Sequence, residues 1–202
     1  MIGIIDYGMG NLASVKKAFA YIGAEAVITD DKTVLKSCDG LVLPGVGAFA
    51  DAMENLNQKG LASLIKEAQN TPLLGICLGM QLLFESSEES PGVPGLGILQ
   101  GTVKRFSGSM GLKIPQMGWN KLFIKEDKRL YRNIQQECDV YFIHSYYVDA
   151  ADRKAVAAEC EYGITYDASI ETGSLFATQF HPEKSGIVGL QILRNFYAEV
   201  TK

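Results

Sequence analysis

The feature that most constrains this fold is a cysteine between two glycines in the segment 73–81, which reads LLGICLGMQ. An apolar run precedes Cys77 and a helix-like stretch follows it, which is the pattern of a nucleophile elbow at a strand-to-helix turn. Gly75 and Gly79 remove the Cβ atoms that would clash in such a turn, and a helix N-terminus favours the thiolate. The segment therefore predicts strand, sharp turn and helix, with Cys77 as a nucleophile rather than a small buried hydrophobe.

Short apolar runs alternate with helical patterns in the first half of the chain. The runs are almost continuously apolar, as in parallel strands that are covered on both faces. The helical patterns end before a glycine or before Asn70 and Pro72, which stop helices. This alternation predicts an α/β fold with a doubly wound, mostly parallel sheet. The expected strands are 2–6, 26–29, 41–43 and 73–77, and the expected helices are 12–22 and 61–68.

The second half of the chain changes character. From about residue 98 to 180, short β-like stretches are separated by glycine and proline, which predicts an antiparallel extension of the main sheet. The clearest of these stretches are 140–143, 155–158, 164–169 and 175–180. A last helix is expected over 185–200, packed on the sheet through one apolar stripe made of Ile187, Leu190, Leu193, Tyr197 and Val200.

Length and charge limit the classes of function. With 202 residues, the chain is expected to form a single domain over 1–202 with a full core. A net charge of -4, without a run of lysine or arginine, argues against nucleic-acid binding. Neither a membrane-length apolar stretch nor a signal peptide is found, so we expect a cytoplasmic protein. The other cysteines are scattered and no histidine cluster accompanies them, so no metal and no cofactor are expected.

A base for Cys77 must come from the two histidines of the chain, His144 and His181. His181 ends an apolar stretch in the string TQFHPE, at 178–183. Residues two apart in an extended segment point the same way, so Glu183 is expected beside His181, where its carboxylate would hold the imidazole tautomer. Nucleophile, base and orienting carboxylate together predict a covalent enzyme.

Five further motifs occur along the chain: DYGMGNL at 6–12, PGVG at 44–47, QMGWN at 116–120, HSY at 144–146 and HPEKS at 181–185. With GICLGMQ and QFHPE, they make the chain similar over nearly its whole length to the class I glutamine amidotransferases, and among them to glutaminase subunits of imidazole glycerol phosphate synthase. The resemblance implies a flavodoxin-like amidotransferase domain whose triad of Cys77, His181 and Glu183 hydrolyses L-glutamine through a thioester. It also implies a heterodimer in which ammonia passes to a cyclase subunit in histidine biosynthesis.

An oxyanion hole is expected on two sides of Cys77. The residue after the nucleophile of an elbow supplies one N–H donor, which here is Leu78. The PGVG segment resembles the oxyanion strand of the family, so Val46 is expected as the second donor, beside Gly47. The glycines of this segment permit a peptide flip, which could depend on the partner, although an ordinary glycine-rich turn is the alternative.

The resemblance also implies the residues that hold the amino and carboxylate groups of glutamine: Gly45, Gln81, Glu89, His144, Ser145 and Tyr146. Two alternatives stay open for this set. Glu89, with the neighbouring glutamates, could be part of a solvated acidic turn. His144 could be a structural histidine whose backbone, rather than its ring, contacts substrate.

Three residues are expected on the partner face by the same resemblance: Asn11, Trp119 and Lys184. An equally supported interpretation of Trp119 is that its side chain belongs to the hydrophobic core.

Other classes of protein remain possible from the sequence. The string GMGNLA at 8–13 follows an apolar run, and Asp30 ends the next one, as in dinucleotide-binding Rossmann units. That reading leaves the cysteine elbow and the His-Pro-Glu string unexplained, and a tight turn accounts for the glycines. A glutaminase of another synthase, such as pyridoxal phosphate synthase, shares the elbow and the histidine-glutamate pair. A non-catalytic interaction protein would need none of Cys77, His181 and Glu183.

Overall fold

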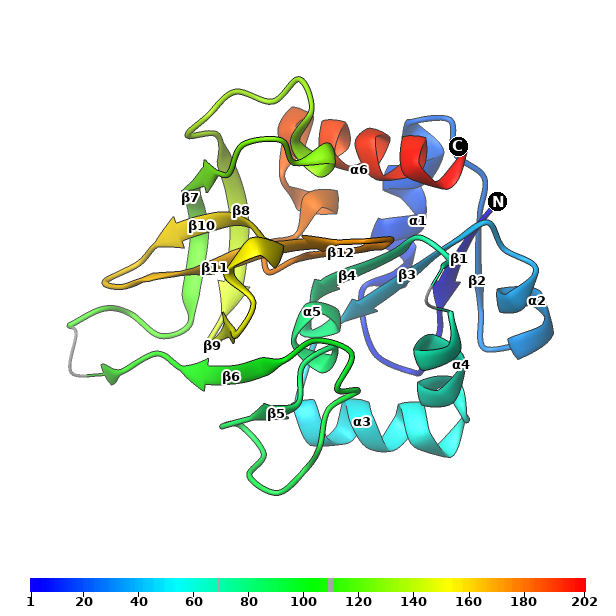
Figure 1. Ribbon diagram of the computed structural model, residues 1–202, viewed down its shortest axis with the longest axis horizontal. Helices are drawn as coiled ribbons and strands as arrows, with labels where there is room; N and C mark the ends of the chain where they lie inside the picture. Colours follow the sequence, from blue (N-terminus) through cyan, green and yellow to red (C-terminus); the bar gives the residue numbers. More distant parts are fainter. Residues whose placement is uncertain (69, 109–110) are drawn as a thin grey trace.

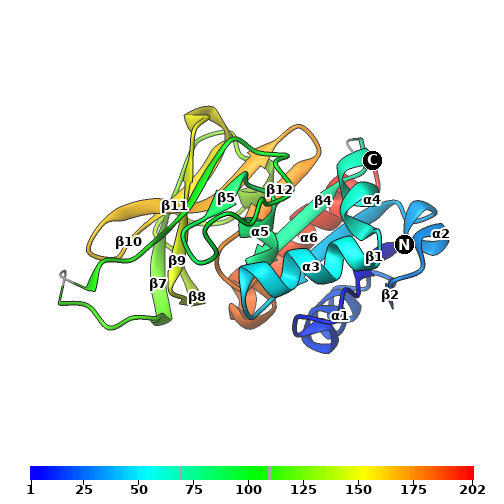
Figure 2. The ribbon, with the colours of Figure 1, turned by 90° about the horizontal axis from the view of Figure 1, so that it is seen from below.

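The computed structural model describes residues 1–68, 70–108 and 111–202. Its strands form one sheet with the order β2-β1-β3-β4-β12-β11-β10-β7-β8, from which β5, β6 and β9 branch (Figure 1). Figure 2 shows the parallel and the antiparallel parts of the sheet side by side, with a strong twist between them. The expectation of an α/β fold with a mostly parallel sheet and an antiparallel extension is confirmed.

Five strands make the parallel part: β1 (Ile2–Ile5), β2 (Ala26–Thr29), β3 (Gly40–Gly45), β4 (Leu73–Cys77) and β12 (Leu175–Thr178). All but the edge strand β2 are buried along their whole length. Helices cover both faces of these strands, which is why their residues are apolar in succession rather than in alternation.

Two helices, α1 (Leu12–Tyr21) and α6 (Gly186–Val200), cover one face of the sheet, and four others cover the opposite face (Figures 1 and 2). The four are α2 (Lys32–Lys36), α3 (Phe49–Gln58), α4 (Leu61–Glu67) and α5 (Leu78–Leu82). The α1 helix begins at Asn11, whose side-chain oxygen accepts a hydrogen bond from the Ser14 N–H, and ends before Gly23, at φ +81°. The sequence analysis did not predict α2 or α3, although α3 buries Phe49, Ala52, Met53 and Leu56 at helical spacing.

The stripe predicted for α6 is wrong in part. Ile187 is 85% exposed, and the buried face consists of Gly189, Ile192, Leu193, Asn195, Phe196 and Glu199. The helix is therefore rotated by about one residue from the predicted stripe. Gly189 explains the rotation, because a Cβ there would lie 1.9 Å from the Pro182 carbonyl oxygen, so this position must pack closest to the preceding turn.

The antiparallel part contains β7 (Gln116–Ile124), β8 (Asp139–His144), β9 (Tyr146–Ala150), β10 (Val156–Glu161) and β11 (Thr165–Thr172). The short strands β5 (Ser86–Ser87) and β6 (Gly101–Arg105) lie at its edge, and 3-10 turns lie at η2 (Arg129–Tyr131), η3 (Arg153–Ala155) and η4 (Pro182–Lys184). The sequence analysis did not predict β6, β7 or β9.

The prediction that the stretch 175–180 belongs to the antiparallel extension is only partly right. The β12 strand pairs in parallel with β4, in the register Leu175 to Leu73 and Thr178 to Ile76, and pairs antiparallel only with β11. Its direction follows from the turn at Gly173, which reverses the chain after β11. Because β4 and β12 are neighbours and run the same way, the residues that follow them meet at the same edge of the sheet.

Candidate active site

Cys77 lies at that carboxyl edge, between β4 and α5, with φ +54° and ψ −110°. This conformation is rare for a residue with a side chain and is typical of a nucleophile elbow. The glycines on either side permit the close approach of the turn, since a Cβ on Gly79 would lie 1.8 Å from the Leu43 carbonyl oxygen. The α5 helix has only five residues, so strain and packing, more than a helix dipole, define the position of Cys77.

His181 and Glu183 lie beyond the end of β12 and form a buried pair. Nδ1 of His181 is 2.8 Å from Oε1 of Glu183, and the two side chains are 3% and 1% exposed. Nε2 of His181 is buried and has no hydrogen-bond partner of ordinary length among the described residues. Burial lowers the pKa of His181, but the Cys77 sulfur and the Glu183 carboxylate outweigh it and raise this pKa to about 10. The pair therefore favours an imidazolium beside Cys77.

The segment that carries His181 is tied to β8. The His181 N–H donates to the Tyr141 carbonyl oxygen at 3.0 Å, and the Ser185 hydroxyl donates to the His181 carbonyl oxygen at 2.6 Å. The same hydroxyl oxygen accepts a hydrogen bond from the Tyr141 N–H at 3.0 Å. The backbone around the imidazole is thus held on two sides, which limits movement of the ring.

A cavity of about 270 Å³ opens over Cys77. Ile143 is the one lining residue among the described positions that lies outside the predicted site; the others are Val46, Gly47, Cys77, Leu78, Gln81, Glu89, His144, Ser145 and Tyr146. Gly45 does not line this cavity; it is buried, and its backbone packs against Leu78 and Gly79. The volume suits a ligand of amino-acid size, and the mixture of backbone and polar side chains suits one with charged ends.

Gln179 is a polar residue of the site that the sequence analysis missed. It follows β12, is fully buried, and donates from Nε2 toward the Cys77 sulfur at 3.7 Å. Its Oε1 accepts a hydrogen bond from Nε2 of Gln81 at 2.9 Å, and Gln81 also donates to the Tyr146 carbonyl oxygen. Its place two residues before His181 was the available signal, because alternate residues of an extended segment share a side. Gln179 therefore links Gln81 to the Cys77 sulfur, and it lies on the same segment as His181.

The carboxylates of Glu85, Glu88 and Glu89 make specific hydrogen bonds and are not merely solvated. Each accepts a backbone N–H at 2.8–2.9 Å: Glu85 from Gly101, Glu88 from Arg105 and Glu89 from Phe49. The last contact caps α3, whose own N-cap residue makes no side-chain hydrogen bond. One oxygen of Glu89 thus holds a helix end while the residue lines the cavity.

The ring of His144 is a buried structural group. Nδ1 lies 2.7 Å from the Tyr146 carbonyl oxygen and Nε2 lies 3.2 Å from the Tyr166 hydroxyl. Burial lowers the pKa of His144 to about 4, so the ring is neutral at pH 7 and Nδ1 carries the proton that it donates. Both ring nitrogens lie against groups inside the protein, which supports the alternative that the backbone of His144, rather than its ring, contacts substrate; that contact stays a prediction.

Trp119 is 54% exposed, so the reading of this residue as a core aromatic is wrong. Its ring meets the Tyr141 ring edge-on at 6.1 Å, and the Lys184 ammonium lies 5.9 Å from the centre of the same Tyr141 ring. Met117 and Ile187 are also exposed. Ile187 follows Gly186, and a Cβ on Gly186 would lie 3.9 Å from the Trp119 ring, so Ile187 is close to this ring. We call these five residues, Met117, Trp119, Tyr141, Lys184 and Ile187, the aromatic patch. Asn11 is also exposed, as the cap of α1.

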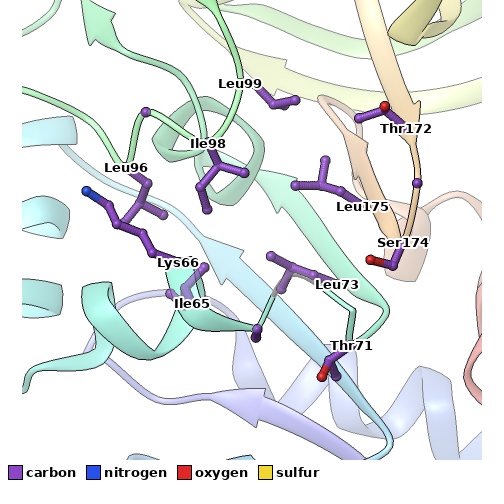
Figure 3. Close-up of a pocket in the computed structure, with 13 residues that line it drawn as sticks. Ile65, Lys66, Thr71, Leu73, Leu96, Ile98, Leu99, Thr172, Ser174 and Leu175 are labelled. Carbon is purple, nitrogen blue, oxygen red and sulfur yellow. The ribbon is translucent and has the colours of Figure 1, made fainter.

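A larger cavity, of about 580 Å³, lies at the other end of β4 and β12 (Figure 3). Leu73 and Leu175, the first residues of these strands, are on its wall, with Thr71, Ser174 and Ile98. None of the predicted site residues lines this cavity, so a choice of the active site by cavity volume alone would have missed Cys77.

The glycine-rich loop at 6–11 does not have the neighbours of a dinucleotide site. Asp30, the expected ribose ligand, accepts a hydrogen bond from the Lys59 ammonium at 2.9 Å, and the same ammonium bonds the Asp6 carbonyl oxygen. Gly8 and Gly10 have φ of +89° and +114°, which accounts for glycine at both positions as a turn requirement.

The model of the family described as glutamine amidotransferase class-I matches residues 3–200. A solved structure described as a glutamine amidotransferase superposes with a TM-score of 0.78 over 100% of this chain and 99% of its own, at 20% identity, which shows the shared fold. The chain therefore belongs to the class I glutamine amidotransferase family. No helix among the described residues is long and apolar enough to cross a membrane.

Within this family the chain is similar to proteins named imidazole glycerol phosphate synthase subunit HisH. The protein from Geobacillus kaustophilus is 51% identical, over 100% of this chain and 98% of its own length. The protein from Moorella thermoacetica is 50% identical, over 96% of this chain and 93% of its own length. Identity of this degree over whole chains makes this protein a member of the same subunit family.

Proposed function

We propose that this chain is the glutaminase subunit of an imidazole glycerol phosphate synthase, and that it hydrolyses L-glutamine at Cys77. The observation that carries the proposal is that His181, paired with Glu183 after the end of β12, interacts with Cys77 at the end of β4, where Cys77 lines a cavity of about 270 Å³. The chain lines up with the HisH subunits over its whole length, whereas a glutaminase of pyridoxal phosphate synthase is favoured by no feature of the site.

The reaction follows from the geometry of the triad. The Cys77 thiolate attacks the side-chain amide carbon of glutamine, and a carbon–sulfur bond forms. The imidazolium of His181 gives its proton to the departing nitrogen, so the carbon–nitrogen bond breaks and ammonia leaves. Neutral His181 then takes a proton from water, which attacks the thioester and releases glutamate and the thiolate. Glu183 keeps the ring oriented through Nδ1.

The oxyanion of each tetrahedral intermediate needs N–H donors in the cavity wall. We assign these to Leu78, which follows the nucleophile, and to Val46, which with Gly47 forms the opposite wall. Gly47 has φ +105°, and because glycine has no Cβ the peptide at this position can turn. At the other end of the cavity, we propose that Gln81, Glu89 and the segment 144–146 hold the amino and carboxylate groups of glutamine. A direct contact of Gly45 with glutamine stays a prediction.

Ammonia released at Cys77 is consumed by a cyclase subunit, which forms imidazole glycerol phosphate and an aminoimidazole carboxamide ribotide. We propose that the aromatic patch and Asn11 form the face that binds this subunit. Large exposed apolar side chains beside a lysine fit an interface better than a solvated surface. A cytoplasmic location stays a prediction, which fractionation of cells would test.

The proposal is tested with the chain in complex with its cyclase. Wild type and Cys77→Ala are compared with glutamine and with ammonium chloride as the nitrogen source. We expect the variant to lose the glutamine-dependent synthesis and to retain the ammonium-dependent synthesis. Loss of both activities, or of neither, would contradict the proposed role of Cys77, and binding of a dinucleotide by a chain without glutaminase activity would revive the Rossmann reading.

A further inference from the structure

Tyr7, in the glycine-rich loop after β1, has no part in the reaction described above, yet it lies directly behind the cavity wall. Its side chain is fully buried, and its hydroxyl donates to the Pro44 carbonyl oxygen at 2.8 Å. Pro44 stands at the start of the PGVG segment that carries the proposed oxyanion donor Val46. The hydroxyl thus reaches from one strand end to the next and holds the backbone just before this segment.

The contact lies close to the nucleophile. Gly45 is paired with Cys77 in the register of β3 and β4, and a Cβ on Gly45 would lie 2.5 Å from the Tyr7 hydroxyl and 2.9 Å from the Gly79 nitrogen. The hydroxyl therefore occupies the space that a side chain at position 45 would need. Glycine is required there because a side chain would meet both Tyr7 and the elbow.

The bond fixes the peptide plane that directly precedes the one carrying the Val46 N–H. The carbonyl that Tyr7 holds belongs to the peptide between Pro44 and Gly45, so this plane cannot turn without breaking a buried hydrogen bond. The first rotation available to the Val46 N–H is then about Gly45. Burial, and secondarily the nearby Cys77, raise the pKa of Tyr7, so the phenol stays protonated and remains a donor.

A second side chain of the same loop backs the far end of the segment. A Cβ on Gly47 would lie 2.5 Å from Cε of Met9, so Met9 packs against Gly47 as Tyr7 does against Gly45. The loop that resembles a dinucleotide-binding motif is in this way a support for the cavity wall. Its glycines let two alternate side chains, Tyr7 and Met9, turn toward the PGVG segment.

We propose that Tyr7 is a positioning residue for the oxyanion hole: by holding the Pro44 carbonyl, its hydroxyl places the Val46 N–H for the tetrahedral intermediates. The inference rests on the proposed glutaminase function. It assigns Tyr7 an effect on the transition state and none on glutamine binding, because Tyr7 does not line the cavity.

The test compares Tyr7→Phe with wild type in the complex with the cyclase and its phosphoribulosyl formimino carboxamide nucleotide. The phenylalanine ring keeps the packing and removes only the hydroxyl. Tyr162→Phe is the matched control, because the Tyr162 hydroxyl also donates to a backbone carbonyl oxygen at 2.8 Å, that of Lys113, away from the cavity. The measurements are kcat and KM for glutamine, the rate at which iodoacetamide alkylates Cys77, and the melting temperature.

We expect Tyr7→Phe to lower kcat by about tenfold, since a displaced oxyanion donor costs rate and not binding. KM should stay within about twofold, and alkylation, which forms no oxyanion, should be unchanged. Tyr162→Phe should match wild type in kcat. A wild-type kcat for Tyr7→Phe, or a parallel change of kcat, KM and alkylation rate, would overturn the role of Tyr7. Absence of glutaminase activity in wild type would instead refute the proposed function itself.

Discussion

Oε1 of Glu183 lies 2.8 Å from Nδ1 of His181, and both side chains are almost wholly buried. A carboxylate in this position fixes the orientation of the ring and stabilises the imidazolium, while the Cys77 sulfur acts on the same ring. The pair comes from a stretch of three residues, His-Pro-Glu, in which the turn η4 begins immediately after the histidine. The proposed base and its proposed orienting group are therefore held together at the end of β12.

The first prediction concerns the charge of Glu183. Glu183→Gln keeps the shape but loses the carboxylate that raises the pKa of His181. We expect kcat for glutamine to fall by about 10²- to 10⁴-fold with little change in KM, because Glu183 does not line the cavity. Steady-state kinetics of the complex measure this change, and the exposed Glu126→Gln is the control. A kcat within threefold of wild type would exclude the orienting role.

The second prediction concerns Gln179, which bridges Gln81 and the Cys77 sulfur. Gln179→Leu removes the acceptor that holds the Gln81 amide, and leaves that buried amide with one bond fewer, at about 1–3 kcal/mol. We expect KM for glutamine to rise about tenfold, since Gln81 lines the cavity and would turn away. Gln191→Leu, on α6, is the control. An unchanged KM would show that Gln81 is held in place by the Tyr146 carbonyl oxygen alone.

The third prediction concerns the effect of pH on stability. Burial holds the pKa of His144 at about 4, below its ordinary value of 6.5, so between these values the unfolded chain binds a proton that the folded chain does not. The free energy of unfolding should therefore fall as pH is lowered from about 6.5 to 4. His144→Asn, which keeps a donor near the Tyr146 carbonyl oxygen, should make the fall in melting temperature between pH 7 and pH 5 shallower.

His181 should act in the opposite direction and in another pH range. Its pKa in the folded protein is raised to about 10, so its contribution to stability is complete below about pH 6.5 and is lost as pH rises toward 10. His181→Gln therefore serves as the comparison for His144→Asn, because it should keep most of the acid slope: burial is the largest cause of the lowered His144 pKa, and the charge of His181 is a smaller one. Equal acid slopes for wild type and His144→Asn would contradict the assignment of His144 as a neutral buried group.

The fourth prediction concerns the aromatic patch. Trp119→Ala removes an exposed side chain that contacts Tyr141 at its edge. We expect binding to the cyclase to weaken about 30-fold, as for a central tryptophan of an interface, and the melting temperature of the isolated chain to change little. Titration calorimetry measures the binding, with Phe123→Ala on the same strand as the control, since Phe123 is 39% exposed. Equal affinities for the two variants would place the interface elsewhere.

Some elements of the fold were predictable and others were not. The buried parallel strands of the first half were found because burial on both faces leaves an uninterrupted apolar run. The β7 strand was missed because large apolar side chains, Met117 and Trp119, lie on its exposed face, so apolar residues do not mark its buried face. The α3 helix carried a clear helical spacing at 49, 52, 53 and 56 and could have been found.

The sequence by itself determined the chemistry of this protein: a cysteine in a glycine-flanked turn, and a histidine with a carboxylate two residues on. These depend on neighbours in the chain, where local sterics and side-chain direction suffice. Only the tertiary structure decided that β12 runs parallel to β4, that Gln179 joins Gln81 to the Cys77 sulfur, and that Tyr7 stands behind Gly45. Strand direction, register and packing across the sheet join segments far apart in the chain, and no local pattern encodes which of them will meet.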